Sequence, residues 1–426
     1  MVQNLEAKLA ILMTMAADDR EGMPGREITM APPRLRNAER AGPLRPLNLR
    51  NVRVGQTGTR AKLLRVLMTN ACSFNCHYCP MRRDRELPRT LLKAEEVVRI
   101  FLDARARGWA DGLFLTTGIP GRPTKVMDDI IEVLDLLRGK HGYRGYIHVK
   151  IVPGADDAQV DRITSMANRV SINLETACGE TLTTIAPEKK FETTLVALQR
   201  AQRRVVDARN DERAGKPTDA LRPGGTAGIT TQFVVGASKD SDRTIMAKSA
   251  ELYGSGGMHH IHFSAFRPIR DTPLEHAPGA PPLREHRLYQ ADHLVRQYRF
   301  SHDELVFDGA GNLTLEHDPK VAWAIAHPER FPVELRTASR EELLRVPGIG
   351  PLAARRIVER RRATAIRGLA DLRALGVVTK WAQGFLTIAG RRLAAERWKE
   401  QLSLWKPEEE AGVRRELFEF SPGTFR

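Results

Sequence analysis

Cysteine is scarce in this sequence. Only four cysteines occur among 426 residues, and three of them fall within eight consecutive positions. This distribution excludes the disulfide framework of small secreted domains, which needs cysteines paired along the chain. A tight cluster in a reducing compartment is instead typical of metal binding or redox chemistry. We therefore expect a cytoplasmic protein.

Long apolar runs are also missing. No stretch approaches the roughly 20 apolar residues that a membrane-spanning helix needs. The N-terminal run LAILMTMAA follows Glu6 and lacks the basic segment that precedes the apolar core of a signal peptide. We predict an amphipathic helix there and no membrane partner.

Acidic residues are outnumbered by basic ones. The chain has 67 Lys and Arg against 52 Asp and Glu, which gives a net charge of +15. This excess favours a polyanionic partner, because cations that neutralise phosphates release condensed counterions. Nucleic acid is the leading expectation, although a generally Arg-rich proteome would give the same excess.

Six short apolar runs alternate with helix-like segments from Lys62 onwards. Strand and helix in strict alternation require parallel strands joined by crossover helices, and hence an α/β sheet or barrel. Reactive groups of such folds lie on the loops at the carboxyl ends of the strands. The predicted strands span 63–69, 112–117, 145–151, 169–174, 228–235 and 259–265.

The pattern along the chain divides it into five predicted segments. An N-terminal helix and an Arg/Pro-rich arm occupy 1–60, and the α/β barrel occupies 61–280. A helical connector follows at 281–336. An all-α hairpin module is expected at 337–400, and a tail without a clear pattern at 401–426.

The three clustered cysteines directly follow the first predicted strand. Cys72, Cys76 and Cys79 form a C-x3-C-x2-C pattern in ACSFNCHYCP. A structural zinc site takes four ligands, so His77 or Cys178 would have to complete an unusual set. A [4Fe–4S] cubane held by three thiolates keeps one iron open for an external ligand. Zinc stays possible on these grounds, but the spacing favours the cubane.

This motif, with Tyr78 just before the last cysteine, resembles the radical S-adenosylmethionine superfamily. The resemblance covers about 62–276 and implies a partial (β/α)6 barrel. It implies two cofactors, a [4Fe–4S] cluster ligated by Cys72, Cys76 and Cys79, and S-adenosylmethionine chelated to the open iron. One-electron reduction by a flavodoxin or ferredoxin would then cleave S-adenosylmethionine to a 5′-deoxyadenosyl radical.

The resemblance also implies contacts to S-adenosylmethionine. They would come from the turn TTGIPG, the fourth strand SINLETA, the fifth strand TTQFVVGAS and the exit of the sixth strand. Strand alternation places the polar residues of SINLETA on one face. The chain departs from the family pattern at SKDSD, where a Gly-Glu-containing turn is expected. The predicted cofactor contacts are Tyr78, Thr117, Gly118, Ser171, Asn173, Glu175, Gln232, Val234, Gly236 and Phe266.

Several histidines, a lysine and the fourth cysteine lie in or near the predicted strands, but no motif assigns them a function. His259 and His260 are adjacent, so a strand would point them to opposite faces. We expect His260 and His262 to line the barrel rather than bind a metal. Lys150 is a further interior candidate, and Cys178 is expected to be a buried or loop thiol.

The segment RVPGIGPLAARRIV fits a helix-hairpin-helix motif. Its glycines permit a tight turn, and their N–H groups at the start of a helix can hold a phosphate. Such contacts hold the backbone of a nucleic acid and not its bases; packing against another protein is the alternative. Leu352 stands where an iron–sulfur glycosylase would have its lyase lysine. The predicted nucleic-acid contacts are Val346, Gly348, Ile349, Gly350, Arg355 and Arg356.

The whole arrangement is similar to the family of DNA modification/repair radical S-adenosylmethionine proteins, which is associated with uracil-DNA-glycosylase-like partners. It implies an enzyme that modifies or repairs a nucleotide, with DNA favoured over RNA. Two alternatives stay open. One is radical modification of tRNA or rRNA, and the other is a nucleic-acid-binding protein with a structural or redox-sensing cluster. The sequence names no catalytic residue.

Overall fold

The computed structural model describes residues 5–18, 49–54, 59–216 and 228–393. These residues belong to two compact units. Unit 1 comprises Met1–Asp240, Glu251–Pro282 and Phe420–Arg426, and unit 2 comprises Ser241–Ala250 and Leu283–Glu419. Most of the predicted arm and the whole predicted tail lie outside the described residues.

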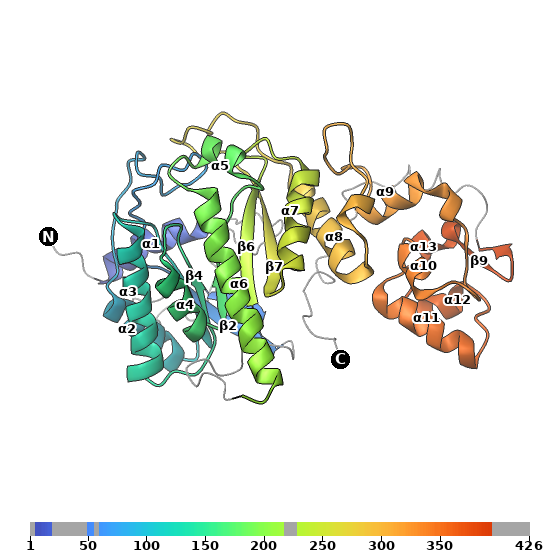
Figure 1. Cartoon of the computed structure of the whole chain (residues 1–426), viewed down its shortest axis with the longest axis horizontal. Helices are drawn as coiled ribbons and strands as arrows, with labels where there is room; N and C mark the ends of the chain where they lie inside the picture. The colour runs from blue at the N-terminus through green and yellow to red at the C-terminus, as the bar shows by residue number, and fades with distance from the viewer. Residues whose placement is uncertain (1–4, 19–48, 55–58, 217–227, 394–426) are drawn as a thin grey trace, which may run out of the picture. The chain divides into compact units, whose positions relative to one another are not determined.

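Unit 1 is built on a seven-stranded sheet with the strand order β1 to β7 (Figure 1). β1 pairs antiparallel with β2, and the six strands from β2 to β7 pair parallel. The prediction of six parallel strands is therefore confirmed. The strands are β1 (Leu49–Val54), β2 (Thr59–Leu67), β3 (Gly112–Thr116), β4 (Ile147–Lys150), β5 (Arg169–Ser171), β6 (Gly228–Val235) and β7 (Met258–Ala265).

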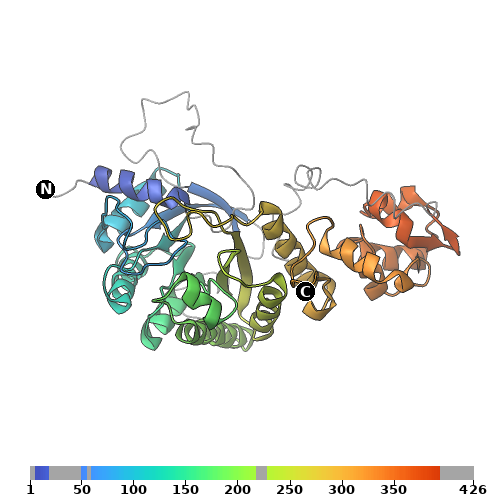
Figure 2. The ribbon, with the colours of Figure 1, turned by 90° about the horizontal axis from the view of Figure 1, so that it is seen from above.

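The helices between these strands lie along the outer side of the curved sheet (Figure 2). Their apolar residues recur at helical spacing, and on α2 the side chains of Val97, Ile100 and Phe101 are all buried. Asp156 caps α4 by accepting from the Gln159 N–H. The helices are α1 (Leu5–Asp18), α2 (Ala94–Ala106), α3 (Pro123–Asp135), α4 (Asp157–Met166), α5 (Gly179–Ile185), α6 (Phe191–Arg213) and α7 (Asp242–Gly254).

The two faces of the sheet differ in chemistry. Leu64, Leu113 and Val149 are fully buried on the apolar face. The alternate positions carry polar side chains such as Arg65 and His148, which are less than 10% exposed.

Unit 2 is mostly helical but is not all-α, so that part of the fold prediction is wrong. It contains a small sheet in the order β10-β9-β8. These strands have only two or three residues, too few to show an alternating pattern, and the Glu334 carboxylate holds them by accepting the Ala389 and Gly390 N–H groups. The elements are α8 (Pro282–Tyr298), α9 (Pro319–Ala326), β8 (Val333–Glu334), α10 (Arg340–Arg345), α11 (Pro351–Ala363), α12 (Leu369–Ala374), α13 (Thr379–Ala382), β9 (Leu386–Ile388) and β10 (Arg391–Arg392).

Helices long and apolar enough to cross a membrane are absent from the described part of the chain.

Candidate functional site

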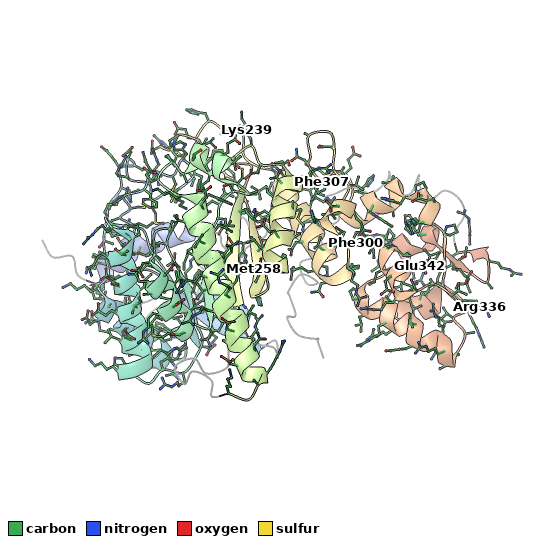
Figure 3. The ribbon with its side chains drawn as sticks, in the orientation of Figure 1. Lys239, Met258, Phe300, Phe307, Arg336 and Glu342 are labelled. Carbon is green, nitrogen blue, oxygen red and sulfur yellow. The ribbon has the colours of Figure 1, made fainter. Side chains whose placement is uncertain are left out.

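The cysteine loop lies at the carboxyl end of β2, where parallel α/β sheets place their functional groups. Figure 3 shows the two ends of the sheet, with Met258 at the start of β7 and Lys239 beyond the end of β6. Cys76 is buried, and Cys72 and Cys79 are half-buried. The loop thus presents three thiols at the functional edge of the sheet.

Arg89 holds the shape of this loop. Its guanidinium donates hydrogen bonds to the carbonyl oxygens of Asn70 and Met81 at 2.5 and 2.8 Å. It also donates to the carbonyls of Arg82 and Arg85 at 2.6 and 2.9 Å. One side chain therefore ties together main-chain groups on both sides of the three cysteines.

The turn after β3 is packed directly against the loop. The Gly118 N–H donates to the Thr69 carbonyl at 2.7 Å. A Cβ at Gly118 would lie 2.3 Å from the Ala71 carbonyl oxygen, so no other residue fits without displacing the loop. The neighbouring Thr117 hydroxyl donates to the Gly118 carbonyl at 2.7 Å. The sequence predicted these two residues as cofactor contacts, and the structure gives Gly118 a packing role as well.

A buried ion pair stands beside the cysteines. Lys189 Nζ lies 2.8 Å from Glu175 Oε1 and 3.1 Å from the Tyr78 hydroxyl. Burial alone would raise the pKa of Glu175, but the Lys189 and Lys150 cations hold it below its usual value. Burial raises the pKa of Tyr78 well above its usual value, so this phenol stays neutral. Lys189 thereby joins two predicted cofactor contacts, Tyr78 and Glu175.

Burial also raises the pKa values of two of the cysteine thiols. It raises the pKa of Cys76 to about 11 and that of Cys79 to about 12, while the Lys189 cation opposes the shift at both. Ligation to a metal would favour the thiolates, and the nearby Lys189 charge would stabilise the resulting anionic site.

The donor set fits a [4Fe–4S] cluster better than a single metal ion. Among the described residues, no group of three or more His, Cys, Asp or Glu side chains is arranged to hold one ion. In a cubane each thiolate binds a different iron, so the three sulfurs need not converge on one point. Cys72, Cys76 and Cys79 would each hold one iron in such a cluster.

The other predicted cofactor contacts lie along β5, β6 and the loops that follow them. Asn173 Nδ2 lies 3.4 Å from Gln232 Oε1, and its own Oδ1 is buried without a hydrogen-bond partner in the described part of the chain. The Ser171 hydroxyl forms hydrogen bonds with the His148 imidazole and with the Thr230 hydroxyl.

The last three predicted cofactor contacts, Val234, Gly236 and Phe266, lie at the carboxyl edge of the sheet and are held there by main-chain interactions. The Val234 N–H donates to the Glu175 carbonyl at 2.8 Å, and Gly236 turns the chain after β6 with φ +84°. Phe266 is buried, with its N–H bonded to Val235 and its carbonyl to Ala280. These three residues thus support the site through their backbone.

Sequence reasoning missed Arg89 and Lys189. Neither belongs to a recognisable motif, and Lys189 acts on partners that are distant along the chain. Lys189 lies 111 positions from Tyr78. For Lys189, the only feature of the sequence that could have indicated its role is that it is a basic residue in the segment APEKK after α5.

In unit 2, α10, a tight turn and α11 follow one another as predicted, and Glu342 on α10 is labelled in Figure 3. Gly348 has φ +80°, and a Cβ there would lie 2.5 Å from the Val378 carbonyl oxygen. The Gly348 carbonyl accepts from the Val378 N–H at 2.9 Å. Within the described residues, the N–H groups of Gly348 and Gly350 have no acceptor. Gly350 is the N-cap of α11, which leaves its N–H available at a helix start.

Val346 and Ile349 build the turn from inside. Their side chains are buried in the core of unit 2. The Ile349 N–H donates to the Val346 carbonyl, and the Ile349 carbonyl accepts from Lys320 Nζ at 2.6 Å. Neither side chain faces solvent. Val346 and Ile349 were predicted to contact nucleic acid, but their side chains instead pack inside the protein.

Arg355 and Arg356 are exposed on α11, as a phosphate contact requires. The segment 337–393 contains twelve Lys or Arg and four Asp or Glu, so it carries about half of the net charge of the chain. Arg361, in contrast, donates to the Leu335 and Ala338 carbonyls and is a structural residue.

Comparison with known proteins supplies one family match. Residues 66–211 match the model of the Radical SAM superfamily, which is about a third of the chain. No curated protein matches the chain.

Several solved structures share part of the arrangement. The hydrogenase maturase HydG from Carboxydothermus hydrogenoformans is 18% identical with a TM-score of 0.41, over 53% of this chain and 49% of that one. The methyltransferase TsrM from Kitasatospora setae is 15% identical with a TM-score of 0.37, over 50% and 38%. Methylornithine synthase (PylB) is 13% identical with a TM-score of 0.40, over 82% and 85%.

The chain spans about half the length of the maturase, and similarity at this level does not define its substrate. The family match covers β2 to α6 and contains the whole cysteine loop. Proteins of this superfamily use a [4Fe–4S] cluster and S-adenosylmethionine. Residues 66–211 therefore form a radical SAM superfamily domain, and these two cofactors are the ones that its cysteine loop would hold.

Proposed function

We propose that this enzyme modifies or repairs a nucleotide, in DNA rather than RNA. The observation that carries the proposal is the presence, in one chain, of the cysteine loop and of the basic segment formed by α10, its tight glycine turn and α11. The first supplies radical chemistry, and the second has the charge and the N–H groups to hold a phosphate.

The radical SAM domain is proposed to act through the residues at the carboxyl edge of its sheet. The cluster and S-adenosylmethionine, when bound, supply a 5′-deoxyadenosyl radical on reduction, for which a flavodoxin or ferredoxin is the proposed electron donor. Arg89 and Gly118 keep the cysteine loop in its shape. Lys189 pairs with Glu175, and its positive charge would favour the thiolate forms of Cys76 and Cys79 when they are ligated.

The segment 337–393 is proposed to hold the nucleic acid backbone. The Gly348 and Gly350 N–H groups lie at the start of α11, where the helix dipole favours an anion. Arg355 and Arg356 add exposed positive charge on the same helix. These contacts are independent of base sequence, so the choice of nucleotide would depend on the radical SAM domain. A duplex base would have to leave the stack to reach it.

The test is anaerobic reconstitution of the cluster, followed by addition of dithionite and S-adenosylmethionine. We expect 5′-deoxyadenosine to form, and to form faster with single-stranded DNA than without nucleic acid. Cys76→Ala should abolish it, whereas Cys178→Ala should not. An intact cluster that gives no deoxyadenosine under any condition contradicts the proposal.

The same assay separates DNA from RNA. Stimulation by DNA and not by transfer RNA supports DNA as the substrate. Stimulation by transfer RNA alone would overturn that part of the proposal while leaving the radical chemistry in place.

A further inference from the structure

The end of α5 and the turn that follows it are fastened to the cysteine loop by two hydrogen bonds. The His77 N–H donates to the carbonyl of Ile185, the last residue of α5, at 2.8 Å. The Asn75 N–H donates to the Glu188 carboxylate at 3.1 Å. These two N–H groups stand on either side of Cys76 in the sequence. The turn is therefore held against the middle of the C-x3-C-x2-C pattern.

Lys189 follows directly in this turn and reaches the next part of the loop. Its ammonium group donates a hydrogen bond to the Tyr78 hydroxyl at 3.1 Å and lies 5.7 Å from the centroid of the Tyr78 ring. Tyr78 is joined directly to Cys79, the last of the three cysteines. The Lys189 side chain is only 11% exposed, so water and salt screen its charge weakly. A poorly screened cation therefore stands beside the residues that would hold the cluster.

The position of Lys189 is also fixed from the side of the sheet. Glu175, whose Oε1 lies 2.8 Å from Lys189 Nζ, has a left-handed φ of +68°, which is uncommon for a residue other than glycine. Main-chain hydrogen bonds hold this conformation. The Glu175 N–H donates to the Gln232 carbonyl at 2.9 Å, and the Glu175 carbonyl accepts from the Val234 N–H at 2.8 Å. The cysteine loop on one side and the sheet on the other thus keep the ammonium group in one place.

The Glu175 carboxylate is not matched to Lys189 alone. It also interacts with the Lys150 cation, so two positive charges act on one negative charge. Among the charges that shift the pKa of Cys76, the Lys189 cation, which lowers it, acts more strongly than Glu175 or Glu188, which raise it. Removing Lys189 would therefore leave the surroundings of the cysteine loop more negative.

We propose that Lys189 raises the reduction potential of the [4Fe–4S] cluster that Cys72, Cys76 and Cys79 would hold. One-electron reduction adds a negative charge to the cluster, and a fixed cation nearby stabilises the reduced form more than the oxidised one. The electron comes from an external donor, which is dithionite in vitro, and no bond to Lys189 forms or breaks. The inference concerns the cofactor, so it does not depend on which substrate the radical attacks.

The test is a potentiometric titration of the reconstituted full chain with dithionite, followed by electron paramagnetic resonance of the reduced cluster. It is done without S-adenosylmethionine, and the signal is normalised to bound iron and sulfide, so that incomplete loading does not affect the midpoint potential. Lys189→Met should lower the ratio of reduced to oxidised cluster at a given potential about tenfold or more, a shift of about 59 mV for one electron. Lys189→Arg keeps the charge and should titrate close to the wild type. The matched control is Lys190→Met, which changes the exposed neighbour at the start of α6 and should titrate as the wild type does.

Glu175→Gln makes the opposite change and decides the question if Lys189→Met loads no cluster. It removes the carboxylate that opposes Lys189, so the midpoint potential should rise. Three results would each overturn the proposal: an unchanged midpoint in loaded Lys189→Met, an equal fall in Lys189→Arg and Lys189→Met, or a midpoint in Glu175→Gln that does not rise. Failure of DNA to stimulate deoxyadenosine formation would, in contrast, affect only the proposed function.

Discussion

At the scale of single residues, the cysteine loop depends on two basic side chains that the motif does not contain. Arg89 satisfies several main-chain carbonyls, which would otherwise be without a donor in this shape of the loop. Lys189 brings a positive charge to the thiols and bridges Tyr78 and Glu175. The three cysteines supply the ligands, and these two residues supply the geometry and the charge.

Replacing Arg89 with Gln should loosen the loop. The change leaves buried or half-buried carbonyls without donors, at about 1–3 kcal/mol for each group left unsatisfied. We expect Arg89→Gln to retain less iron and sulfide per chain after reconstitution. Arg99→Gln, an exposed arginine of α2, is the matched control and should load fully. Full loading of Arg89→Gln would show that the cluster itself fixes the loop.

The ligands could be predicted from sequence, but their supports could not. Cys72, Cys76 and Cys79 lie close together, and their spacing alone predicts a shared metal site. Arg89 and Lys189 act through contacts that only the folded chain creates, and Arg89 is one of many arginines in a basic sequence. Gly118 is an intermediate case, because TTGIPG predicted a turn but not its contact with Ala71.

At the scale of elements, the α10–α11 turn is held from two sides. The Gly348 carbonyl accepts from Val378, which precedes α13, and the Ile349 carbonyl accepts from Lys320 on α9. Lys320 is buried, and its Nζ also lies 4.6 Å from the Tyr298 ring centroid. The turn therefore keeps its carbonyls inside and its glycine N–H groups outside.

Burial lowers the pKa of Lys320 well below its usual value of 10.5. The unfolded chain then binds more protons than the folded one between the two pKa values, so the stability of unit 2 should rise with pH up to about 10.5. Hydrogen exchange of the α10 and α11 amides, corrected for intrinsic rates, measures this. Lys320→Met should abolish the pH dependence, and the exposed Lys380→Met should retain it. The same pH dependence in Lys320→Met would assign it to another group.

The limits of sequence reasoning are clearest at element ends. The residues from Asp207 to Gly225 are polar and rich in helix breakers, a composition typical of an irregular connection, yet α6 continues to Arg213 and the chain turns at Gly215. ARNDER is polar but contains good helix formers, so its polarity does not indicate an irregular segment. The sequence does not predict β1, because LRNVRV has no strict apolar alternation and lies in a segment rich in Arg and Pro.

At the scale of the whole molecule, about half of the net positive charge lies in 337–393. Exposed arginines act on nucleic acid through counterion release, so their contribution is sensitive to ionic strength. The salt dependence of binding should therefore report on this segment.

DNA binding should be strongly salt-dependent and should depend on α11. Each phosphate contact contributes about −0.9 to the slope of log affinity against log salt for duplex DNA. The double variant Arg355→Gln, Arg356→Gln should reduce the slope by about that amount for each phosphate that α11 no longer neutralises, with little change in sequence preference. Fluorescence anisotropy at several salt concentrations measures this, with Arg99→Gln as the control. An unchanged slope would exclude α11 as the DNA-binding helix.

The hydrogen bonds of Arg89 involve only peptide carbonyls and no cysteine sulfur. The frame around the cysteines is thus chemically independent of what the sulfurs bind. A protein that loses its iron to oxygen would keep this frame, and could be reloaded without refolding. This domain would then differ from zinc fingers, in which losing the metal also means losing the fold.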